Sequence, residues 1–438
     1  MTGKTFKIIT LGCKVNQYES AYIKERFTAA GWRQGLKNGE ADITVINTCI
    51  VTQRASYQSR QAIRKAIREN SSGMTAAIGC YAQVFPEELS RIEGISIIAG
   101  NKEKTKLPDM LINGEYSGRT CVISEPFQKN KTFELLPIKG FLDRTRAFLK
   151  IQDGCESFCS YCIVPFARGP LRSLDPSRVI KMLEILYEND YKEVVLTGVH
   201  LGRYGADLKE GIELKELLHR IGNEGLPLRI RLSSLEPNEI DEEMIDIVAS
   251  EAWLCRHFHI PLQSGDDYIL KKMNRHYARK DFAGLVERIH ARVPLAAIGV
   301  DTMAGFPGEN DRAHQNTFSL INDLPVSYLH VFPFSPRKGT AAVEFPDHVN
   351  QKVIKKRAGE LRDLGRRKRE VFYRSCLGKE FLVLAEGWHS EKEKMTKGLS
   401  DNYLPVIFPS SRLIRNSMLK VRMEEIGEDV IIGRSVGI

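Results

Sequence analysis

The sequence lacks any run approaching the roughly 20 consecutive apolar residues of a membrane-spanning helix. Its first ten residues, MTGKTFKIIT, contain neither the long apolar stretch nor the small-residue cleavage site of a secretory signal. We therefore expect a cytoplasmic protein with no membrane association. Thiols stay reduced in that compartment, so clustered cysteines there indicate metal binding or catalysis more often than disulfides.

The sequence also lacks a strong excess of charge. It has 64 Lys and Arg against 55 Asp and Glu, a formal net charge of +9. This modest excess favours an anionic partner such as nucleic acid. With 438 residues and 42% hydrophobic content, the chain has the composition of a globular protein and is long enough for about three domains.

Residues 4–115 alternate short apolar runs with helix-like segments, which indicates a parallel sheet with crossover helices. Three of the predicted strands lead directly into a cysteine: FKIITLGC into Cys13, ADITVINTC into Cys49 and MTAAIGC into Cys80. Carboxyl ends of parallel strands meet at one edge of a sheet, so we expect these thiols to lie together. Each could instead be a small buried hydrophobe, but three in equivalent positions favour a shared metal or cluster site.

We interpret residues 116–140 as a linker, and Cys121 within it as structural. From 141 to 371 the chain again alternates, with six strand-like runs that predict a partial (β/α)6 barrel with its chemistry at the carboxyl ends of the strands. Cys255 stands at the start of a strand, so we assign it to packing. Polar or glycine-rich tips follow several of the runs. They are Thr197-Gly198, Ser233-Ser234, Gln263-Ser264 and Gly305 to Glu309.

A cysteine motif without a fourth cysteine follows the first barrel strand. In DGCESFCSYC the pattern C-x3-C-x2-C places Cys155, Cys159 and Cys162 close together. Structural zinc sites use four ligands, so a remote His or Cys would have to close a zinc site here. Three thiolates can instead hold a 4Fe–4S cluster and leave one iron open for a small molecule. The position at the carboxyl end of a barrel strand favours the second interpretation.

A basic helix is predicted over residues 355–374, where nine Lys or Arg against three Asp or Glu give 9 − 3 = +6. It is either a solvated surface or an RNA-binding face. Residues 374–438 contain four β-type runs, KEFLVLAEG, YLPVIFP, MLKVRMEEI and DVIIGRSVG. They predict a small barrel of the kind that binds single-stranded nucleic acid. We take Cys376, at the edge of this barrel, as structural. The candidate RNA-contacting residues are Lys355, Lys356, Arg357, Arg366, Arg367, Lys368 and Arg369.

C-x3-C-x2-C with Tyr161 before its last cysteine resembles the radical S-adenosylmethionine signature, and the second cysteine set narrows the resemblance to the methylthiotransferases. The resemblance covers nearly the whole chain. It implies two 4Fe–4S clusters, one on Cys155, Cys159 and Cys162, and an auxiliary one on Cys13, Cys49 and Cys80. It also implies that the tail, with its GLSDNY segment, is an RNA-binding TRAM domain.

S-adenosylmethionine is the cofactor that the resemblance implies, as methyl donor and as radical source. Tyr161 would lie against its adenine, and Thr197 and Gly198 would meet its amino acid end. We also assign Ser234, Gln263 and Gly305 to cofactor binding. His200, His257 and His259 flank barrel strands and either contact cofactor or substrate or line the barrel as satisfied polar residues.

Within the family, LGCKVNQYES, TGVHLGRYG, HFHIPLQSG and LHVFPFSPRKGT resemble the branch that acts on N6-threonylcarbamoyladenosine in tRNA. The expected reaction is methylthiolation at C2 of that base, beside the anticodon. The alternatives are the same chemistry on isopentenyladenosine or on a ribosomal protein side chain, and a non-catalytic, zinc-stabilised RNA-binding protein. The other expected partner is a low-potential electron donor of the flavodoxin or ferredoxin type, and the protein is expected to be a monomer.

Overall fold

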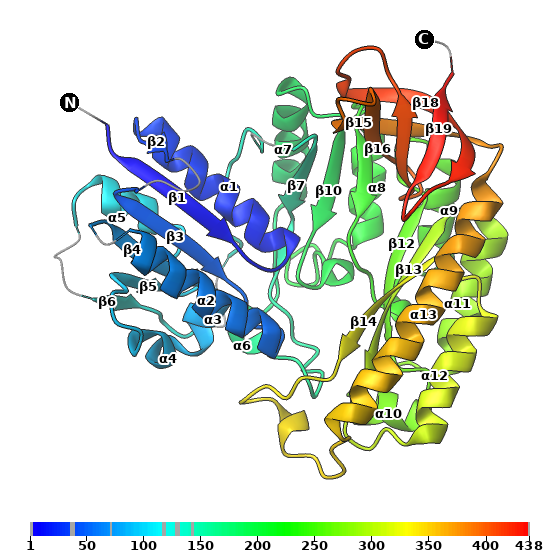
Figure 1. The fold of residues 1–438 in the computed structure, drawn as a ribbon, viewed down its shortest axis with the longest axis horizontal. Helices are drawn as coiled ribbons and strands as arrows, with labels where there is room; N and C mark the ends of the chain where they lie inside the picture. The colour runs from blue at the N-terminus through cyan, green and yellow to red at the C-terminus, as the bar shows by residue number, and fades with distance from the viewer. Residues whose placement is uncertain are drawn as a thin grey trace. The chain divides into compact units, whose positions relative to one another are not determined.

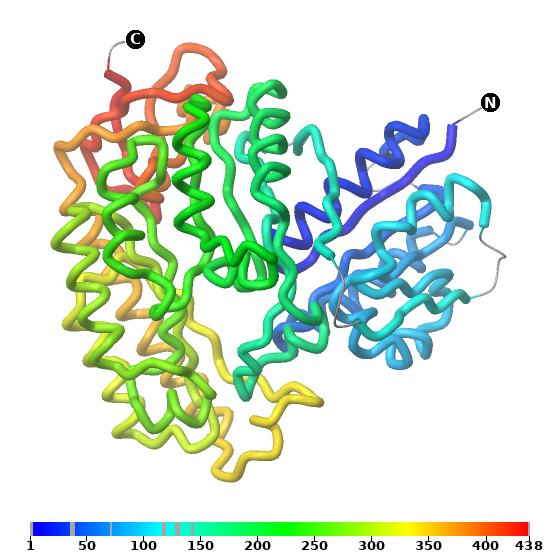
Figure 2. Tube along the Cα trace, turned by 180° about the vertical axis from the view of Figure 1, so that it is seen from behind, coloured from blue at the N-terminus to red at the C-terminus, as the bar shows by residue number. Residues whose placement is uncertain are grey.

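The computed structural model describes residues 3–35, 40–70, 72–115, 120–127, 132–141 and 144–436, drawn in Figures 1 and 2. The chain divides into two compact units, each built from more than one segment. The first comprises Met1–Ile138, Gln152–Leu174 and Ser335–Val343. The second comprises Lys139–Ile151, Asp175–Phe334 and Glu344–Ile438. All six cysteines of the two predicted cluster sites therefore belong to the first unit.

A six-stranded parallel sheet forms the centre of the first unit, in the order β2-β1-β3-β4-β5-β6. The direction in which successive strands are added to the sheet reverses between β1 and β3. The helix after β1 (α1) lies on one face of the sheet, and the helix after β3 (α2) lies on the other. Open α/β sheets bind their ligands at such switch points. The strands are β1 (Thr5–Thr10), β2 (Arg33–Gln34), β3 (Ile43–Thr48), β4 (Met74–Gly79), β5 (Ile97–Ala99) and β6 (Cys121–Ile123).

Helices cover both faces of this sheet (Figure 1). Alternate residues of each strand face opposite sides, so Val45 packs with the α1 and α5 side while Ile46 packs with the α2, α3 and α4 side. Both clusters are fully buried, which makes the predicted parallel-sheet domain a three-layer α/β fold. These helices are α1 (Lys14–Ala29), α2 (Gln53–Glu69), α3 (Cys80–Val84), α4 (Pro86–Ser90) and α5 (Leu107–Ile112).

Strand β6 lies inside the range 116–140 that the sequence indicated as a linker. It pairs in parallel with β5, so that Ile97, Ile98 and Ala99 stand opposite Cys121, Val122 and Ile123. This part of the range is therefore an edge strand of the sheet. Residues 116–119 and 128–131 of the same range lie outside the described residues.

Six parallel strands of the second unit form two three-stranded sheets, β11-β10-β7 and β12-β13-β14. A backbone bridge from Ile230 of β11 to Leu254, just before β12, and a hydrogen bond from Leu235 N to His259 O at 3.0 Å place β12 next to β11. The strands therefore follow one another in chain order, as predicted for the partial barrel. The strands are β7 (Arg146–Lys150), β10 (Glu193–Thr197), β11 (Arg229–Leu232), β12 (His257–Gln263), β13 (Ala297–Ala304) and β14 (Tyr328–Pro333).

Helices connect these strands, and α7 shows why they form where they do. The Asp175 side chain accepts a hydrogen bond from Ser177 N at 2.9 Å, and Pro176 occupies the first turn. Val179, Leu183 and Leu186 then bury one stripe of the helix. The helices are α7 (Pro176–Glu188), α8 (Leu214–Asn223), α9 (Glu242–Ser250), α10 (Asp267–Lys272), α11 (Arg279–Arg292) and α12 (Asp311–Asp323).

A long helix, α13 (Gln351–Cys376), runs along β14 and leads into the tail (Figure 2). Gly365 lies so close to Leu329 of β14 that an added Cβ would come within 3.1 Å of the leucine side chain. The tail is a closed five-stranded barrel, as predicted, although β16 was not among its expected strands. The strands are β15 (Glu380–Ser390), β16 (Met395–Ser400), β17 (Pro405–Pro409), β18 (Arg415–Ile426) and β19 (Ile431–Ser435).

The tail barrel is anchored at the amino ends of the parallel strands. Glu193, the first residue of β10, is fully buried and pairs with Arg229 and Arg231 of β11. Arg229 donates to the carbonyl oxygens of Leu382 and Leu399, and Arg231 to those of Ser400 and Asp401. This buried charge network joins the tail barrel to the end of the parallel strands opposite the predicted chemistry.

Candidate active site

The N-terminal cysteine trio, Cys13, Cys49 and Cys80, lies at the carboxyl ends of three adjacent strands, as predicted. Cys13 precedes α1, Cys49 follows β3 directly and Cys80 is the first residue of α3. Gly79 has φ = 92°, and an added Cβ would come within 2.4 Å of Asn47 Oδ1. Glycine is therefore needed there to turn β4 abruptly into α3 and place Cys80 at the sheet edge.

The three thiols of this trio are close in space. An added Cβ on Gly12, next to Cys13, would lie 2.9 Å from the Cys49 sulfur. Burial, together with the charges of Cys80 and Cys13, raises the pKa of the Cys49 thiol to about 12. The thiol is therefore protonated at neutral pH unless a bound cation stabilises its thiolate.

Two asparagines organise the peptide around the N-terminal trio. Asn16 Nδ2 donates to the carbonyl oxygens of Leu11 at 2.7 Å and Thr48 at 3.1 Å, which ties together the chain before Cys13 and before Cys49. Asn101 Nδ2 lies 3.4 Å from Cys80 Sγ and also donates to Ala167 O at 2.6 Å. The N–H contact to sulfur is of the kind that tunes iron–sulfur clusters.

The loop trio, Cys155, Cys159 and Cys162, is enclosed by a short antiparallel pair, β8 (Gln152–Asp153) and β9 (Arg172–Ser173). Within the loop, Cys155 N donates to Gly169 O at 3.0 Å and Cys162 N to Cys159 O at 2.9 Å. All three cysteines and Tyr161 are half-buried. The loop thus presents three partly accessible thiols on a closed frame.

A buried ionic network connects the loop to the N-terminal trio. Arg168 ends α6 (Val164–Arg168), directly after the loop trio, and is 2% exposed. Its guanidinium lies 2.6 Å from Glu19 and 2.5 Å from Asn16, and Lys104 also pairs with Glu19. Burial alone would lower the pKa of Arg168, but the charges of Cys80 and Glu19 raise it well above its usual range. The sequence reading missed this network, although Asn16 and Glu19 follow Cys13 at helical spacing on α1.

The segment Ser335–Val343 contacts both cysteine-bearing parts of the first unit. Ser335 Oγ accepts from Gln53 N at 3.0 Å, at the start of α2, and Ala342 N donates to Ser160 O at 2.8 Å, inside the loop. An added Cβ on Gly339 would still be 3.9 Å from Ile163. This short segment therefore contacts both the loop that carries the loop trio and the start of α2, which follows Cys49.

In the second unit, the predicted cofactor residues gather at the carboxyl ends of the strands. Thr197 ends β10, Ser234 follows β11 and Gln263 ends β12 with φ = 63°. Gly198 follows Thr197 and is half-buried. Gly305 follows β13 with φ = 80°, and its N–H donates to Glu309 Oε1 at 3.0 Å. These residues therefore lie at the carboxyl ends of the barrel strands, where the sequence predicted the chemistry.

A polar cluster in the middle of β12, β13 and β14 was only partly predicted from the sequence. His259 Nε2 and His330 Nδ1 lie 2.8 Å and 3.1 Å from Asp301 Oδ1, and Ser234 Oγ lies 2.6 Å from His259 Nδ1. Burial would raise the pKa of Asp301, but the hydrogen bonds of His259 and His330 bring it below its usual range. Only His259 and Ser234 were singled out from the sequence, since His330 and Asp301 come from other strands.

The other two predicted histidines have polar or aromatic neighbours. His200 Nε2 lies 2.6 Å from Glu239 Oε1. His257 is 5% exposed, lies 2.8 Å from the Tyr328 hydroxyl and stacks on Tyr403 of the tail, with ring centroids 4.4 Å apart. These contacts favour the second of the two sequence interpretations for His257, that of a polar residue lining the barrel.

The predicted RNA-contacting residues of α13 separate into two groups. Lys355, Lys356, Arg366 and Arg367 are exposed. The prediction is wrong for Arg357, which is 5% exposed and donates to the carbonyl oxygen and carboxylate of Glu309 at 2.8 and 2.9 Å. It holds the Gly305–Glu309 turn instead, because Ile354, Ala358 and Leu361 turn this side of α13 toward the core.

Lys368 and Arg369 are half-buried and have intramolecular partners. Lys368 Nζ donates to Asn322 O at 2.9 Å and also to Leu324 O, at the end of α12. Arg369 pairs with Asp429 of the tail barrel. Both side chains therefore stabilise helix and barrel contacts and are less available to a phosphate backbone than the exposed group.

The donor chemistry of both trios fits an iron–sulfur cluster. Each trio offers three sulfur donors, the soft ligands that a 4Fe–4S cluster takes. A structural zinc ion uses four ligands, so either trio would need a further donor to close a zinc site. Among the described residues, the group whose ligand atoms all lie within 4.8 Å is His259, Asp301 and His330.

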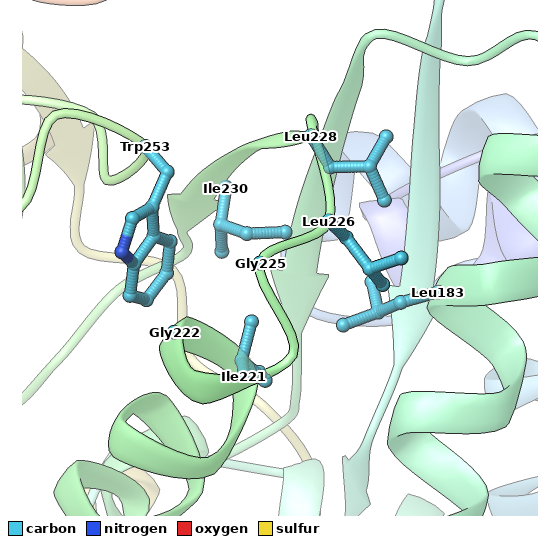
Figure 3. Close-up of a pocket in the computed structure, with 8 residues that line it drawn as sticks. All are labelled: Leu183, Ile221, Gly222, Gly225, Leu226, Leu228, Ile230 and Trp253. Atoms are coloured by element: carbon cyan, nitrogen blue, oxygen red, sulfur yellow. The ribbon is translucent and has the colours of Figure 1, made fainter.

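Cys255 and Cys376 are 2% and 0% exposed and pack in the interior, as the sequence indicated. A small apolar pocket elsewhere in the second unit carries no chemistry (Figure 3). Trp253 closes it against Gly222, where an added Cβ would come within 3.1 Å of the indole. Its walls contain no titratable side chain. They are Leu183, Ile221, Gly222, Gly225, Leu226, Leu228, Ile230 and Trp253.

Residues 149–321 match the model of the radical SAM superfamily, and residues 5–100 match the uncharacterized protein family UPF0004. The threonylcarbamoyladenosine tRNA methylthiotransferase MtaB of Bacillus subtilis is 37% identical over 423 residues, covering 95% of this chain and 93% of that protein. A tRNA-2-methylthio-N(6)-dimethylallyladenosine synthase of Dictyoglomus thermophilum is 30% identical, covering 96% of each chain.

Among solved structures, the radical S-adenosylmethionine methyltransferase TsrM of Kitasatospora setae aligns with a TM-score of 0.53 at 16% identity. The alignment covers 76% of this chain and 75% of that one, and it shows a shared fold. The long, near-complete matches to the curated relatives carry the assignment. The chain belongs to the family of radical S-adenosylmethionine tRNA methylthiotransferases.

Proposed function

We propose that this enzyme methylthiolates C2 of N6-threonylcarbamoyladenosine beside the anticodon of tRNA, giving 2-methylthio-N6-threonylcarbamoyladenosine. The assignment of the substrate rests on the similarity of this chain to the MtaB proteins. Five of them, from five bacteria, are 33–37% identical to this chain, and each alignment covers 87% or more of both proteins. The dimethylallyladenosine synthases reach 30%.

The chemistry requires a radical route, because the C2–H of adenine is not acidic and a general base cannot remove its proton. Two 4Fe–4S clusters and S-adenosylmethionine, when bound, supply the radical, the methyl group and the site for sulfur. The protein contributes binding, orientation and exclusion of water. Cys155, Cys159 and Cys162 would hold the radical cluster, and Cys13, Cys49 and Cys80 the auxiliary one.

We assign the cofactor contacts to Tyr161 in the loop and to a set of residues at the carboxyl ends of the parallel strands. The buried pair Arg357–Glu309 fixes Gly305, whose N–H is bound by the same carboxylate. The strand ends thus present backbone and hydroxyl groups on a rigid frame, which favours precise orientation of a bound molecule. The assigned strand-end residues are Thr197, Gly198, Ser234, Gln263 and Gly305.

tRNA binding is assigned to the exposed cations of α13 and to the tail barrel. Residues 374–438 contain ten Lys or Arg and nine Asp or Glu, a net charge of 10 − 9 = +1. A nearly neutral barrel gains little from counterion release. Lys355, Lys356, Arg366 and Arg367 therefore supply most of the salt-dependent affinity, and the barrel contributes shape and stacking.

The proposal also covers the electron donor, the oligomeric state and the cellular compartment. A flavodoxin- or ferredoxin-type protein would reduce the radical cluster, and the enzyme would act as a monomer in the cytoplasm. No described helix is both long and apolar enough to cross a bilayer.

Mass spectrometry of tRNA nucleosides tests the substrate. A strain lacking the gene should lose 2-methylthio-N6-threonylcarbamoyladenosine and accumulate its unmethylthiolated precursor. Expression of the wild type should restore the product, whereas the Cys155→Ala variant should not. Loss of the methylthio form of isopentenyladenosine, or an unchanged nucleoside profile, would refute the assignment.

A further inference from the structure

A buried arginine with unused hydrogen-bond donors lies beside the N-terminal trio. Arg337, in the segment Ser335–Val343, is 8% exposed. Its Nη2 donates to Ser56 Oγ at 2.9 Å, on the first turns of α2 after Cys49. Among the described residues, its buried Nε and Nη1 have no hydrogen-bond partner. Buried donors are nearly always satisfied in folded proteins, so two on one guanidinium require an explanation.

Among the described residues, no carboxylate forms an ion pair with Arg337. The nearby Tyr81 hydroxyl is bonded to Arg60 at 2.7 Å and to Glu88 at 2.8 Å. Burial lowers the pKa of Arg337 and so does the Arg60 charge, while Tyr81, Cys49 and the more distant Glu88 act in the opposite direction. Burying a cation without a direct ion pair is unfavourable, and a bound anion would offset that cost.

The backbone of this segment fixes the guanidinium in place. Arg337 O accepts from Thr340 N at 3.0 Å and from Thr340 Oγ1 at 2.8 Å. The contacts of Ser335 with Gln53 and of Ala342 with Ser160 hold the two ends. Its free donors are therefore preorganised, since little side-chain entropy remains to be lost on ligand binding.

We propose that Arg337 binds an anionic sulfur ligand, sulfide or a small alkylthiolate, at the auxiliary cluster on Cys13, Cys49 and Cys80. The inference rests on the proposed function in that these three cysteines hold the cluster. Three thiolates leave one iron position without a protein ligand, and a sulfur anion there would carry negative charge into a buried site. Two charge-assisted hydrogen bonds from Nε and Nη1 would satisfy both that anion and the orphaned donors. Arg337 is thus a ligand-binding residue that supplies charge and hydrogen bonds, while the iron supplies the preference for sulfur.

The test uses the full-length chain with Cys155, Cys159 and Cys162 replaced by alanine, so that only the auxiliary cluster is assembled. Anaerobic reconstitution should give about four irons per chain. The electron paramagnetic resonance spectrum of the reduced cluster is followed while sodium sulfide or methanethiolate is added, with chloride and phosphate in parallel. We expect Arg337→Gln to weaken sulfur-anion binding at least tenfold and Arg337→Lys to weaken it less.

Arg64→Gln, an exposed arginine on the same helix as Ser56, is the matched control and should bind sulfide like the parent. Equal sulfide affinity in Arg337→Gln and parent overturns the inference, as does equally tight, Arg337-dependent binding of chloride or phosphate. If Arg337→Gln assembles no cluster, Arg337→Lys decides. Parent-like affinity in that variant leaves Arg337 a structural role only and also overturns the inference. Failure of the parent itself to bind iron would instead refute the proposed auxiliary site.

Discussion

Arg168 and Glu19 form a buried ion pair, with 2.6 Å between Nη1 and Oε1, although 149 residues separate them in the chain. The pair joins the helix after the loop trio to the helix after Cys13. Their side chains are 3% and 1% exposed, and Lys104 pairs with the same carboxylate, so Glu19 compensates two buried cations. The two cysteine trios are therefore held within one unit by charge as well as by the chain.

Loss of the carboxylate of this pair should destabilise the first unit strongly. We expect Glu19→Gln to lower the free energy of unfolding by about 3–5 kcal/mol, since the buried cations Arg168 and Lys104 would lose the carboxylate that they share. Arg168→Gln should cost less, because Lys104 still pairs with Glu19. Denaturant unfolding of the apoprotein measures this. The exposed pair Arg26–Asp109 is the control, and Arg26→Gln should cost under about 1 kcal/mol. Similar costs for the buried and exposed pairs would contradict the prediction.

The cysteine assignments predict metal content. Wild-type protein purified without oxygen should be brown and contain about eight irons per chain. Alanine at Cys13, Cys49 or Cys80 should remove about four of them, and alanine at Cys155, Cys159 or Cys162 the other four. Cys376→Ala should keep all eight, because Cys376 packs in the core of the tail barrel. Colourless protein with bound zinc would be inconsistent with both sites.

Glu193 should make stability depend on acid pH. Burial would raise the pKa of its carboxyl, but Arg231 and Arg229 together lower it to about 2, from an ordinary value near 4.5. The carboxylate's stabilisation is therefore complete above about pH 4.5 and is lost as the pH falls toward 2. It amounts to about 3 kcal/mol.

The difference in unfolding free energy between wild type and Glu193→Gln measures this contribution. It should be large at pH 7 and shrink progressively from pH 4.5 downward. A difference that stayed constant between pH 7 and pH 3 would show that Glu193 does not titrate in this way. Glu216→Gln, an exposed glutamate of α8, should show no comparable change.

Basic residues of α13 should differ in their effect on RNA binding. Replacing exposed Arg366 and Arg367 by glutamine should weaken tRNA binding several-fold and reduce its dependence on salt, since fewer counterions are released. Filter binding between 50 and 200 mM salt gives both quantities. Arg357→Gln should leave tRNA affinity unchanged and impair S-adenosylmethionine binding, because Arg357 holds the Gly305–Glu309 turn. The reverse pattern would disprove this division.

The His259–Asp301–His330 cluster should affect turnover more than folding. Asp301→Asn removes the carboxylate that orients both imidazoles. We expect product formation on tRNA to fall at least tenfold. His330→Asn should have a smaller effect, because His330 is more exposed than His259. Unchanged turnover in Asp301→Asn would remove this cluster from the reaction.

The sequence predicted Cys13, Cys49 and Cys80 as one site because strand ends in a parallel sheet must meet, whatever the details of packing. It also placed Thr197 and Gln263 correctly, since a polar tip after an apolar run marks the end of a strand. Strand β6 was missed because three residues, Cys121–Ile123, are too short to show a period. Strand β16 was missed because MTKGLS has only one large aliphatic side chain.

Other features depend on side-chain direction, which spacing alone does not fix. Arg357 reads as one more cation in a basic helix, and only the angle of α13 against β14 turns it toward Glu309. Asp301 and His330 meet His259 because the parallel register places Asp301 opposite His330 and beside Pro261. Such cross-strand neighbours become visible only when the register is known.

Because Arg229 and Arg231 anchor the tail barrel to the amino ends of the strands, the barrel lies at a fixed distance from their carboxyl ends. If the tail binds tRNA as proposed, the distance from the bound RNA to the carboxyl ends of the strands is set by strand length. The strands have four to eight residues, which span about 13 to 26 Å at about 3.3 Å per residue. The enzyme would then select a nucleotide partly by its distance from the RNA segment bound to the tail, in addition to the groups on its base.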